Sequence, residues 1–144
     1  MSDTAPSCVL LADRHHGLTE GVRGLLETAF GTVVMVADET SLLDGAARLH
    51  PDVAVVDLSL ARDQSLDWLR ALRERSPGLK VVVLSVHDEP SVRRAAMKAG
   101  ADAFVLKRAI ATDLLPAVES VRGGGATPDV AVRPAKRDAQ GAGS

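Results

Sequence analysis

Short apolar runs alternate along the chain with longer segments in which apolar residues recur every three or four positions. The runs are rich in β-branched valine and occupy residues 8–12, 32–37, 53–57, 80–85 and 103–107. Because they do not alternate polar with apolar residues, we expect strands that are buried on both faces, as in a parallel sheet. The segments between them have helical periodicity, of which Leu18, Val22 and Leu25 are one example.

The last two helical segments carry signals for where they end and begin. Residues 89–100, EPSVRRAAMKAG, finish in Gly100, which suits a left-handed helix C-cap. The final segment is expected to start at Thr112 or Asp113. That start would place Pro116 in the first helical turn, where little or no backbone hydrogen bond is lost.

Five strand–helix units in succession predict an α/β fold in which helices cover both faces of the sheet. Right-handed crossovers then favour a (βα)5 doubly wound parallel sheet of the flavodoxin-like order 2-1-3-4-5. We expect one domain at residues 7–122, preceded by a disordered N-terminus at residues 1–6. The tail, residues 123–144, is rich in Gly, Ala and Pro, and is expected to be disordered because it has little apolar surface to bury.

Composition excludes several classes of protein. The 144-residue chain has no apolar run long enough to span a membrane, and its N-terminus lacks the pattern of a signal peptide. The single cysteine, Cys8, cannot form an internal disulfide, so a reducing, cytoplasmic location is expected. A net charge of −2, with one Trp, two Phe and no Tyr, argues against binding to membranes or nucleic acid.

The carboxyl ends of the predicted strands collect residues suited to phosphoryl chemistry. Asp57 ends the third strand, and Ser85 and Lys107 end the fourth and fifth. In a doubly wound sheet these ends lie at one edge, beside the switch point between strands 1 and 3. A carboxylate that attacks a phosphoryl group needs positive charge to hold the phosphate oxygens, and usually a divalent cation. Asp57 alone could equally be a loop cap, but Ser85 and Lys107 at the same edge favour its interpretation as a phosphoryl acceptor.

At these residues the chain resembles a known family. The strings VLLAD, VVDL, VVVLSVHDEPSVRRAAMKAGADAFVLK and LLPAVESVRGG resemble the receiver domain of bacterial two-component response regulators, the CheY-like family. The resemblance covers roughly residues 7–125 and is greatest to the subfamily that usually carries a C-terminal helix-turn-helix. It implies phosphorelay signalling, in which a histidine kinase phosphorylates the Asp of strand 3 in the presence of Mg²⁺.

The resemblance also implies a role for each matching residue. Asp57 would be the phosphoacceptor, and Ser85 and Lys107 would contact the phosphoryl group. Phe104 would be the switch aromatic, whose side-chain position reports the movement of Ser85. The acidic pocket for Mg²⁺ would consist of Asp13, Asp57 and the backbone carbonyl of Ser59.

One position of the acidic pocket departs from the family. The usual pair of acids after strand 1 is here Asp13-Arg14, and a guanidinium group can only donate hydrogen bonds. Asp13, Asp57, Arg14 and Lys107 have a formal charge of −2 + 2 = 0, so Mg²⁺ binding is expected to be weak or absent. Arg14 could pair with one of the acids in place of the metal, or it could point to solvent; the sequence leaves both alternatives open.

Smaller departures lie in the neighbouring loops. Ala61 and Ser65 stand where the family often has Pro and Gly, and Arg108 replaces a proline that often follows the lysine. The changes at Ala61 and Ser65 make the conformation of the loop after Asp57 uncertain, but they leave the predicted fold unchanged.

These features favour a stand-alone receiver that accepts a phosphoryl group on Asp57 and signals by protein–protein interaction. The alternative is a degenerate pseudo-receiver that binds partners without phosphorylation. A flavodoxin-like cofactor-binding domain is disfavoured, because DRHHGLTE after strand 1 has one Gly and no phosphate-cradling pattern. Beyond self-catalysed phosphoryl acceptance and slow autodephosphorylation, no enzymatic activity is expected. The expected partners are a histidine kinase or phosphotransfer protein, a downstream protein and, in a homodimer, a second copy of the chain.

Overall fold

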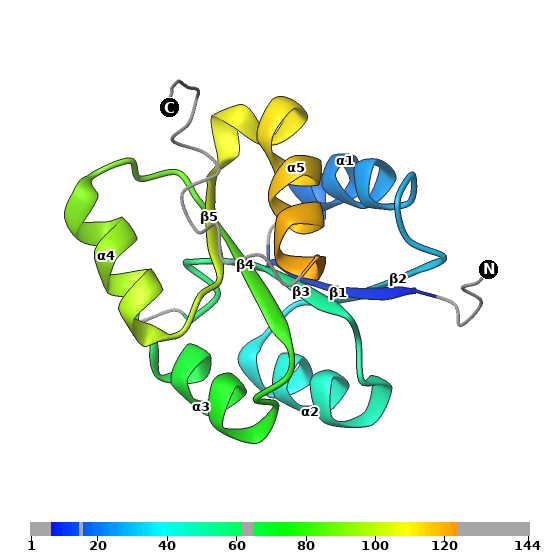
Figure 1. Cartoon of the computed structure of the whole chain (residues 1–144), viewed down its shortest axis with the longest axis horizontal. Coiled ribbons are helices and arrows are strands. Elements are labelled where there is room, and N and C mark those ends of the chain that lie inside the picture. The colour runs from blue at the N-terminus through cyan, green and yellow to red at the C-terminus, as the bar shows by residue number, and fades with distance from the viewer. Residues whose placement is uncertain (1–6, 15, 62–64, 124–144) are drawn as a thin grey trace.

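All five predicted strands pair in parallel into one sheet, in the order β2-β1-β3-β4-β5 (Figure 1). The computed structural model describes residues 7–14, 16–61 and 65–123. The strands are β1 (Cys8–Ala12), β2 (Thr32–Val36), β3 (Val53–Asp57), β4 (Lys80–Ser85) and β5 (Ala103–Leu106). The predicted fold class and strand order are therefore confirmed.

Helices connect successive strands and cover both faces of the sheet. They are α1 (His16–Leu26), α2 (Glu39–Leu49), α3 (Asp67–Arg75), α4 (Pro90–Ala99) and α5 (Ile110–Arg122), with the 3-10 turn η1 (Lys107–Ala109) before α5. Figure 1 shows α1 and α5 on one face and α2, α3 and α4 on the other. The sheet is thus the middle of three layers, as a parallel sheet with crossover helices requires.

The side chains of each strand alternate between two hydrophobic clusters. On β3, Val53 and Val55 belong to the cluster beneath α1 and α5, whereas Ala54 and Val56 belong to the cluster beneath α2, α3 and α4. The predicted burial of both faces holds for β3, which is buried throughout. It is wrong for β2, whose residues are half-buried or exposed, because β2 lies at the edge of the sheet and has one neighbouring strand.

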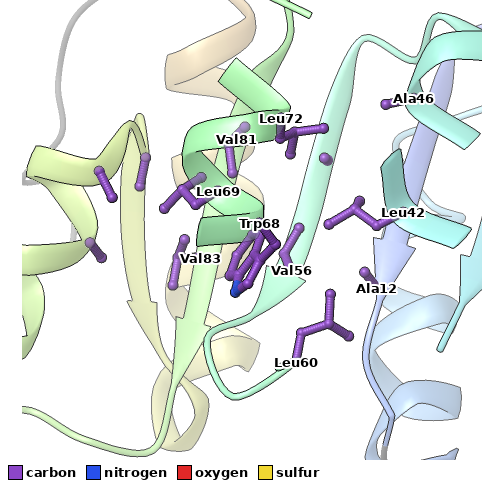
Figure 2. Packing of buried hydrophobic residues seen from close by; sticks show 14 of the residues in the cluster. Ala12, Leu42, Ala46, Val56, Leu60, Trp68, Leu69, Leu72, Val81 and Val83 are labelled. Carbon is purple, nitrogen blue, oxygen red and sulfur yellow. The ribbon is translucent and has the colours of Figure 1, made fainter. Parts of the chain in front are cut away.

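Trp68, at the start of α3, packs that helix against the sheet near the proposed phosphoacceptor. Its side chain is 3% exposed and lies beside Val56 and Leu60, which come from β3 and the segment after it (Figure 2). The indole Nε1 is buried without a hydrogen-bond partner among the described residues. Trp68 and Leu60 therefore hold both ends of the segment that follows Asp57 in the core.

The predicted start of the last helix was wrong. The 3-10 turn that begins at Lys107 leads directly into α5, so the helix begins at Ile110 rather than at Thr112 or Asp113. Pro116 consequently lies inside the helix instead of in its first turn. Since proline has no N–H, the helix gives up one backbone hydrogen bond at this point. The apolar face formed by Leu114 and Val118, both buried, holds the helix on the sheet in spite of that loss.

Gly100 ends α4 in a conformation that favours glycine. Its φ of +130° confirms the predicted C-cap, and its N–H donates to the carbonyl of Met97 at 3.2 Å. A Cβ at this position would collide with the side chain of Arg73. Glycine is therefore required here both by backbone conformation and by the close approach of α3.

The predicted terminal segments lie largely beyond what the structure describes. Residues 1–6 and 124–144 are outside the described residues, whereas Gly123 is the C-cap residue of α5. Within residues 7–14, 16–61 and 65–123, no helix is long and apolar enough to cross a membrane.

Candidate functional site

Three charged residues continue the alternation of their strands by one step toward the same face. Each charged residue lies two positions after an apolar residue of the cluster beneath α1 and α5. The pairs are Leu11 and Asp13, Val55 and Asp57, and Val105 and Lys107. The N–H of Asp13 still donates to the carbonyl of Val36 at 3.1 Å, so the backbone remains in the sheet register at this position. Alternation along parallel strands therefore brings two acids and a base together at the carboxyl edge.

Lys107 joins the two acids in a buried ion-pair cluster. Its Nζ lies 3.1 Å from Oδ1 of Asp57 and 3.6 Å from Oδ2 of Asp13. The side chains of Asp13, Asp57 and Lys107 are only 1%, 3% and 11% exposed. Burial of a charge is unfavourable unless an opposite charge compensates, and the ammonium group of Lys107 supplies such a charge to both acids.

The second oxygen of Asp57 is bonded by a residue from its own loop. Ser59 Oγ donates to Oδ2 of Asp57 at 2.9 Å, and the Ser59 N–H donates to Oδ1 at 3.4 Å. The sequence pointed only to the backbone carbonyl of Ser59 and missed this hydroxyl. A serine two residues after an aspartate is a local signal for such a side-chain turn, and it could have been found from the sequence.

Ser85 reaches the predicted edge, but its hydroxyl bonds its own loop. Ser85 Oγ accepts from the His87 N–H at 2.9 Å and donates to the His87 carbonyl at 3.2 Å. Ser85 continues the alternation of Val81 and Val83, which face the cluster beneath α2, α3 and α4. In this structure the Ser85 hydroxyl is bonded to His87, and Ser85 lines the same cavity as Asp57.

A cavity of about 420 Å³ lies on the Ser85 side of Asp57. Its polar lining includes Asp57, Ser59 and Ser85, and its apolar lining includes Leu66, Val92 and Ala95. It therefore lies between the loop after β3, the loop after β4 and the start of α4. A group of phosphoryl size has room beside the Asp57 carboxylate in this space.

Phe104 lies inside the core in this structure. Its side chain is 4% exposed and belongs to the cluster beneath α2, α3 and α4. It lies in β5, three residues before Lys107, which begins the turn η1. The predicted switching role of Phe104 stays a prediction.

Arg14 does not pair with the acids. Among the described residues it forms no ion pair with Asp13 or Asp57, and Lys107 is the cation that both acids contact. Its Nε is buried without a hydrogen-bond partner in that part of the chain, although the residue as a whole is half-buried. The structure therefore matches neither simple alternative for Arg14, a metal-like pairing or a side chain directed into solvent.

The oxygen donors at this edge fit a Mg²⁺ ion held by few protein ligands. Asp13 and Asp57 supply two carboxylates that contact one ammonium group, and the resemblance to receiver domains implies the backbone carbonyl of Ser59 as a third donor. Mg²⁺ is commonly held by one or two carboxylates and keeps several waters. Across the described residues there is no group of three or more His, Cys, Asp or Glu side chains that could hold a metal. Bound here, Mg²⁺ would neutralise part of the negative charge of a phosphoryl group.

Arg108 forms a contact that the usual proline could not. Its Nη2 lies 3.0 Å from Oδ2 of Asp88, and so joins the turn after β5 to the loop after β4. Both side chains are more than half exposed, which limits the strength of the pair. The contact connects the segment that contains Lys107 to the loop that contains Ser85.

Known proteins are similar to this chain over most of its length. The family model described as "Response regulator receiver domain" matches residues 9–119. The chain is 32% identical over 120 residues to the transcriptional regulatory protein DegU of Brevibacillus brevis, covering 82% of this chain and 51% of DegU. It is 35% identical over 122 residues to the nitrate/nitrite response regulator protein NarP of Escherichia coli K12, covering 83% of this chain and 57% of NarP.

A solved structure shows the same fold. The signal receiver domain of the response regulator NarL from Mycobacterium tuberculosis superposes with a TM-score of 0.72 at 28% identity, covering 84% of this chain and 99% of that chain. The chain spans little more than half the length of the curated relatives DegU and NarP. The similarity is thus to their receiver portion.

Proposed function

Because the chain belongs to the response regulator receiver domain family, we propose that it accepts a phosphoryl group on Asp57 and passes the signal on through protein–protein contacts. The observation that carries this proposal is the ion pair between Lys107 Nζ and Oδ1 of Asp57 at 3.1 Å, beside a cavity that Asp57 itself lines. A buried carboxylate held by a cation at a cavity wall can attack a phosphoryl group whose charge that cation then shares.

The proposed donor is a histidine kinase or a phosphotransfer protein. Transfer adds charge and three acceptor oxygens beside Asp57, and the hydroxyl of Ser85 lies on the wall of the same cavity. We expect Ser85 to exchange its bonds with His87 for a bond to the phosphoryl group. Movement of this loop would alter the surface near α4 and β5, where Phe104 is packed, and a downstream protein or a second copy of the chain would bind that surface.

Incubation with acetyl phosphate and Mg²⁺, followed by intact mass measurement, tests the proposal. The wild-type protein should gain the mass of one phosphoryl group. This gain should then decay slowly as water hydrolyses the acyl phosphate on Asp57. Asp57→Asn should gain none. A persistent mass gain in Asp57→Asn would move the acceptor to another residue. An unmodified wild-type protein, with a known receiver domain phosphorylated in parallel, would contradict phosphoryl acceptance.

A degenerate receiver that binds partners without phosphorylation is the second candidate, and the residue that favours it is Arg14. The acids, Lys107 and Arg14 have a formal charge of zero, so Mg²⁺ has little electrostatic reason to bind at this edge. We propose that Mg²⁺ binds weakly here and that phosphoryl acceptance is correspondingly slow. Equal partner binding by wild-type protein and Asp57→Asn, without phosphodonor, would favour the degenerate receiver.

A further inference from the structure

The loop after β3 holds a hydroxyl group against the proposed phosphoacceptor. The Leu58 N–H donates to the Leu84 carbonyl at 2.7 Å, and the Leu60 N–H donates to the Asp57 carbonyl at 3.0 Å. Residues 57–60 therefore form a turn that is attached to β4. Ser59 lies between these two backbone bonds, within reach of Asp57, and its hydroxyl donates to Oδ2 at 2.9 Å.

The two oxygens of Asp57 have different surroundings. Oδ1 contacts Lys107 Nζ at 3.1 Å and the Ser59 N–H at 3.4 Å, on the side of the buried ion pair. Oδ2 accepts from Ser59 Oγ at 2.9 Å. Ser59 lines the cavity, and in the described part of the chain Lys107 does not. The position of Ser59 in the cavity wall favours Oδ2 as the oxygen that attacks an incoming phosphoryl group.

We propose that the Ser59 hydroxyl is a cap on the attacking oxygen, Oδ2 of Asp57, and that it slows phosphoryl acceptance. This inference rests on the proposed function. With acetyl phosphate as donor, a lone pair of Oδ2 forms the new O–P bond while the bond between phosphorus and the acetyl oxygen breaks. Acetate leaves with that electron pair, and no proton is transferred.

The cap acts because a hydrogen bond to a carboxylate is strongest while the oxygen holds its full negative charge. That charge moves into the O–P bond as phosphoryl transfer proceeds, so the bond from Ser59 is weakened in the transition state. An interaction that favours the ground state over the transition state lowers the rate. Lys107 acts in the opposite sense, since its ammonium group can share the charge of the phosphoryl oxygens.

The test compares Ser59→Ala, Ser59→Thr and wild-type protein by the initial rate of phosphoryl gain, measured by intact mass. Acetyl phosphate is the donor, and Mg²⁺ is raised until the rate no longer increases. Ser59→Ala keeps the backbone carbonyl and removes the hydroxyl, and should react at least about threefold faster, as loss of a bond to a charged acceptor predicts. Ser59→Thr restores the hydroxyl and should return the rate to within about twofold of wild type. Ser120→Ala, near the far end of α5, controls for removal of a serine hydroxyl elsewhere.

The outcomes separate the cap from the proposed function. If Asp57 is phosphorylated at one rate in wild-type protein and Ser59→Ala, or more slowly in Ser59→Ala, the cap is wrong and the proposed function stands. If Ser59→Thr reacts as fast as Ser59→Ala, the hydroxyl is not the cause and the cap is again wrong. If no variant gains phosphoryl mass, both proposals are wrong, because a cap needs a nucleophile that reacts.

Discussion

Aspartates lie at both edges of the sheet, and they make different kinds of contact at each. At the amino edge, Asp52 and Asp102 precede β3 and β5 and make the same pair of bonds to a neighbouring strand. Asp52 accepts from the Cys8 N–H at 3.0 Å and donates its own N–H to the Cys8 carbonyl at 2.9 Å. Asp102 makes the equivalent bonds to Val81, both at 2.8 Å. These acids attach the beginnings of β3 and β5 to the neighbouring strands β1 and β4.

At the carboxyl edge, the contacts of the acids within the described part of the chain are of another kind. Asp13 and Asp57 both contact the ammonium group of Lys107, and Asp57 also accepts a hydrogen bond from the Ser59 hydroxyl. Two buried carboxylates that share one ammonium group are a costly arrangement, and a fold alone does not require it. The contrast teaches that the same residue type attaches strands at one edge and, under the proposed function, takes part in phosphoryl chemistry at the other.

Removal of the shared cation should have the largest effect on stability. Lys107→Met removes the cation that both buried carboxylates contact, and we expect the free energy of unfolding at neutral pH to fall by about 3 kcal/mol. Urea denaturation measures this change. Asp57→Asn in the Lys107→Met background should recover part of the loss, because it removes one of the two neighbouring negative charges. A loss below about 1 kcal/mol for Lys107→Met would mean that water already solvates the cluster.

The comparison of the edges is tested directly by one substitution at each. Asp102→Ala leaves the N–H of fully buried Val81 without its acceptor and breaks the pair with Arg73, so stability should fall by about 2 kcal/mol. Asp57→Asn keeps the shape and leaves Lys107 paired with Asp13, so stability should stay within about 1 kcal/mol of wild type. Equal losses in the two variants would remove the distinction between structural and functional acids.

The charge at position 14 should decide how well Mg²⁺ binds. Arg14→Asp changes the formal charge of the site from 0 to −2 and adds an oxygen ligand. We expect Mg²⁺ affinity to rise at least about tenfold, which corresponds to about 1.4 kcal/mol. Titration followed by Trp68 fluorescence or NMR measures it, with Arg14→Gln as the control that removes charge without adding a ligand. Equal, tight binding by wild-type protein and Arg14→Asp would refute the role of Arg14.

The smallest expected effect is at the amino edge, at Cys8. Burial, and then the charge of Asp52, raises the pKa of the Cys8 thiol above its ordinary value of 9.0. The stabilisation that comes from the neutral Cys8 thiol is therefore complete below pH 9. It is lost as the pH rises through the raised pKa that this thiol has in the folded protein. Alkylation by iodoacetamide should be slower in the folded chain than in urea. Asp52→Asn should speed it by about twofold in the folded chain; no change would leave burial as the only cause.

Local pattern was enough to predict the fold, with errors of one to three residues at element ends. The start of α5 was predicted too late because the signals at Thr112 and Pro116 are local, whereas η1 continues the chain into a helix that packing completes. The same pattern placed Asp13, Asp57 and Lys107 at one edge, since the chain direction of parallel strands determines which ends meet.

What the sequence by itself determined is therefore the sheet, the edge at which the chemistry lies, and the identity of the charged residues there. Only the tertiary structure decided which groups touch. Ser59 bonds Asp57, Ser85 bonds His87, and Arg14 lies half-buried with no ion pair to Asp13 or Asp57 among the described contacts. The physical reason is that strand alternation is a property of neighbouring residues, while hydroxyl and guanidinium directions depend on loop backbone angles. Those angles are set by bonds to other strands, such as that from Leu58 to Leu84.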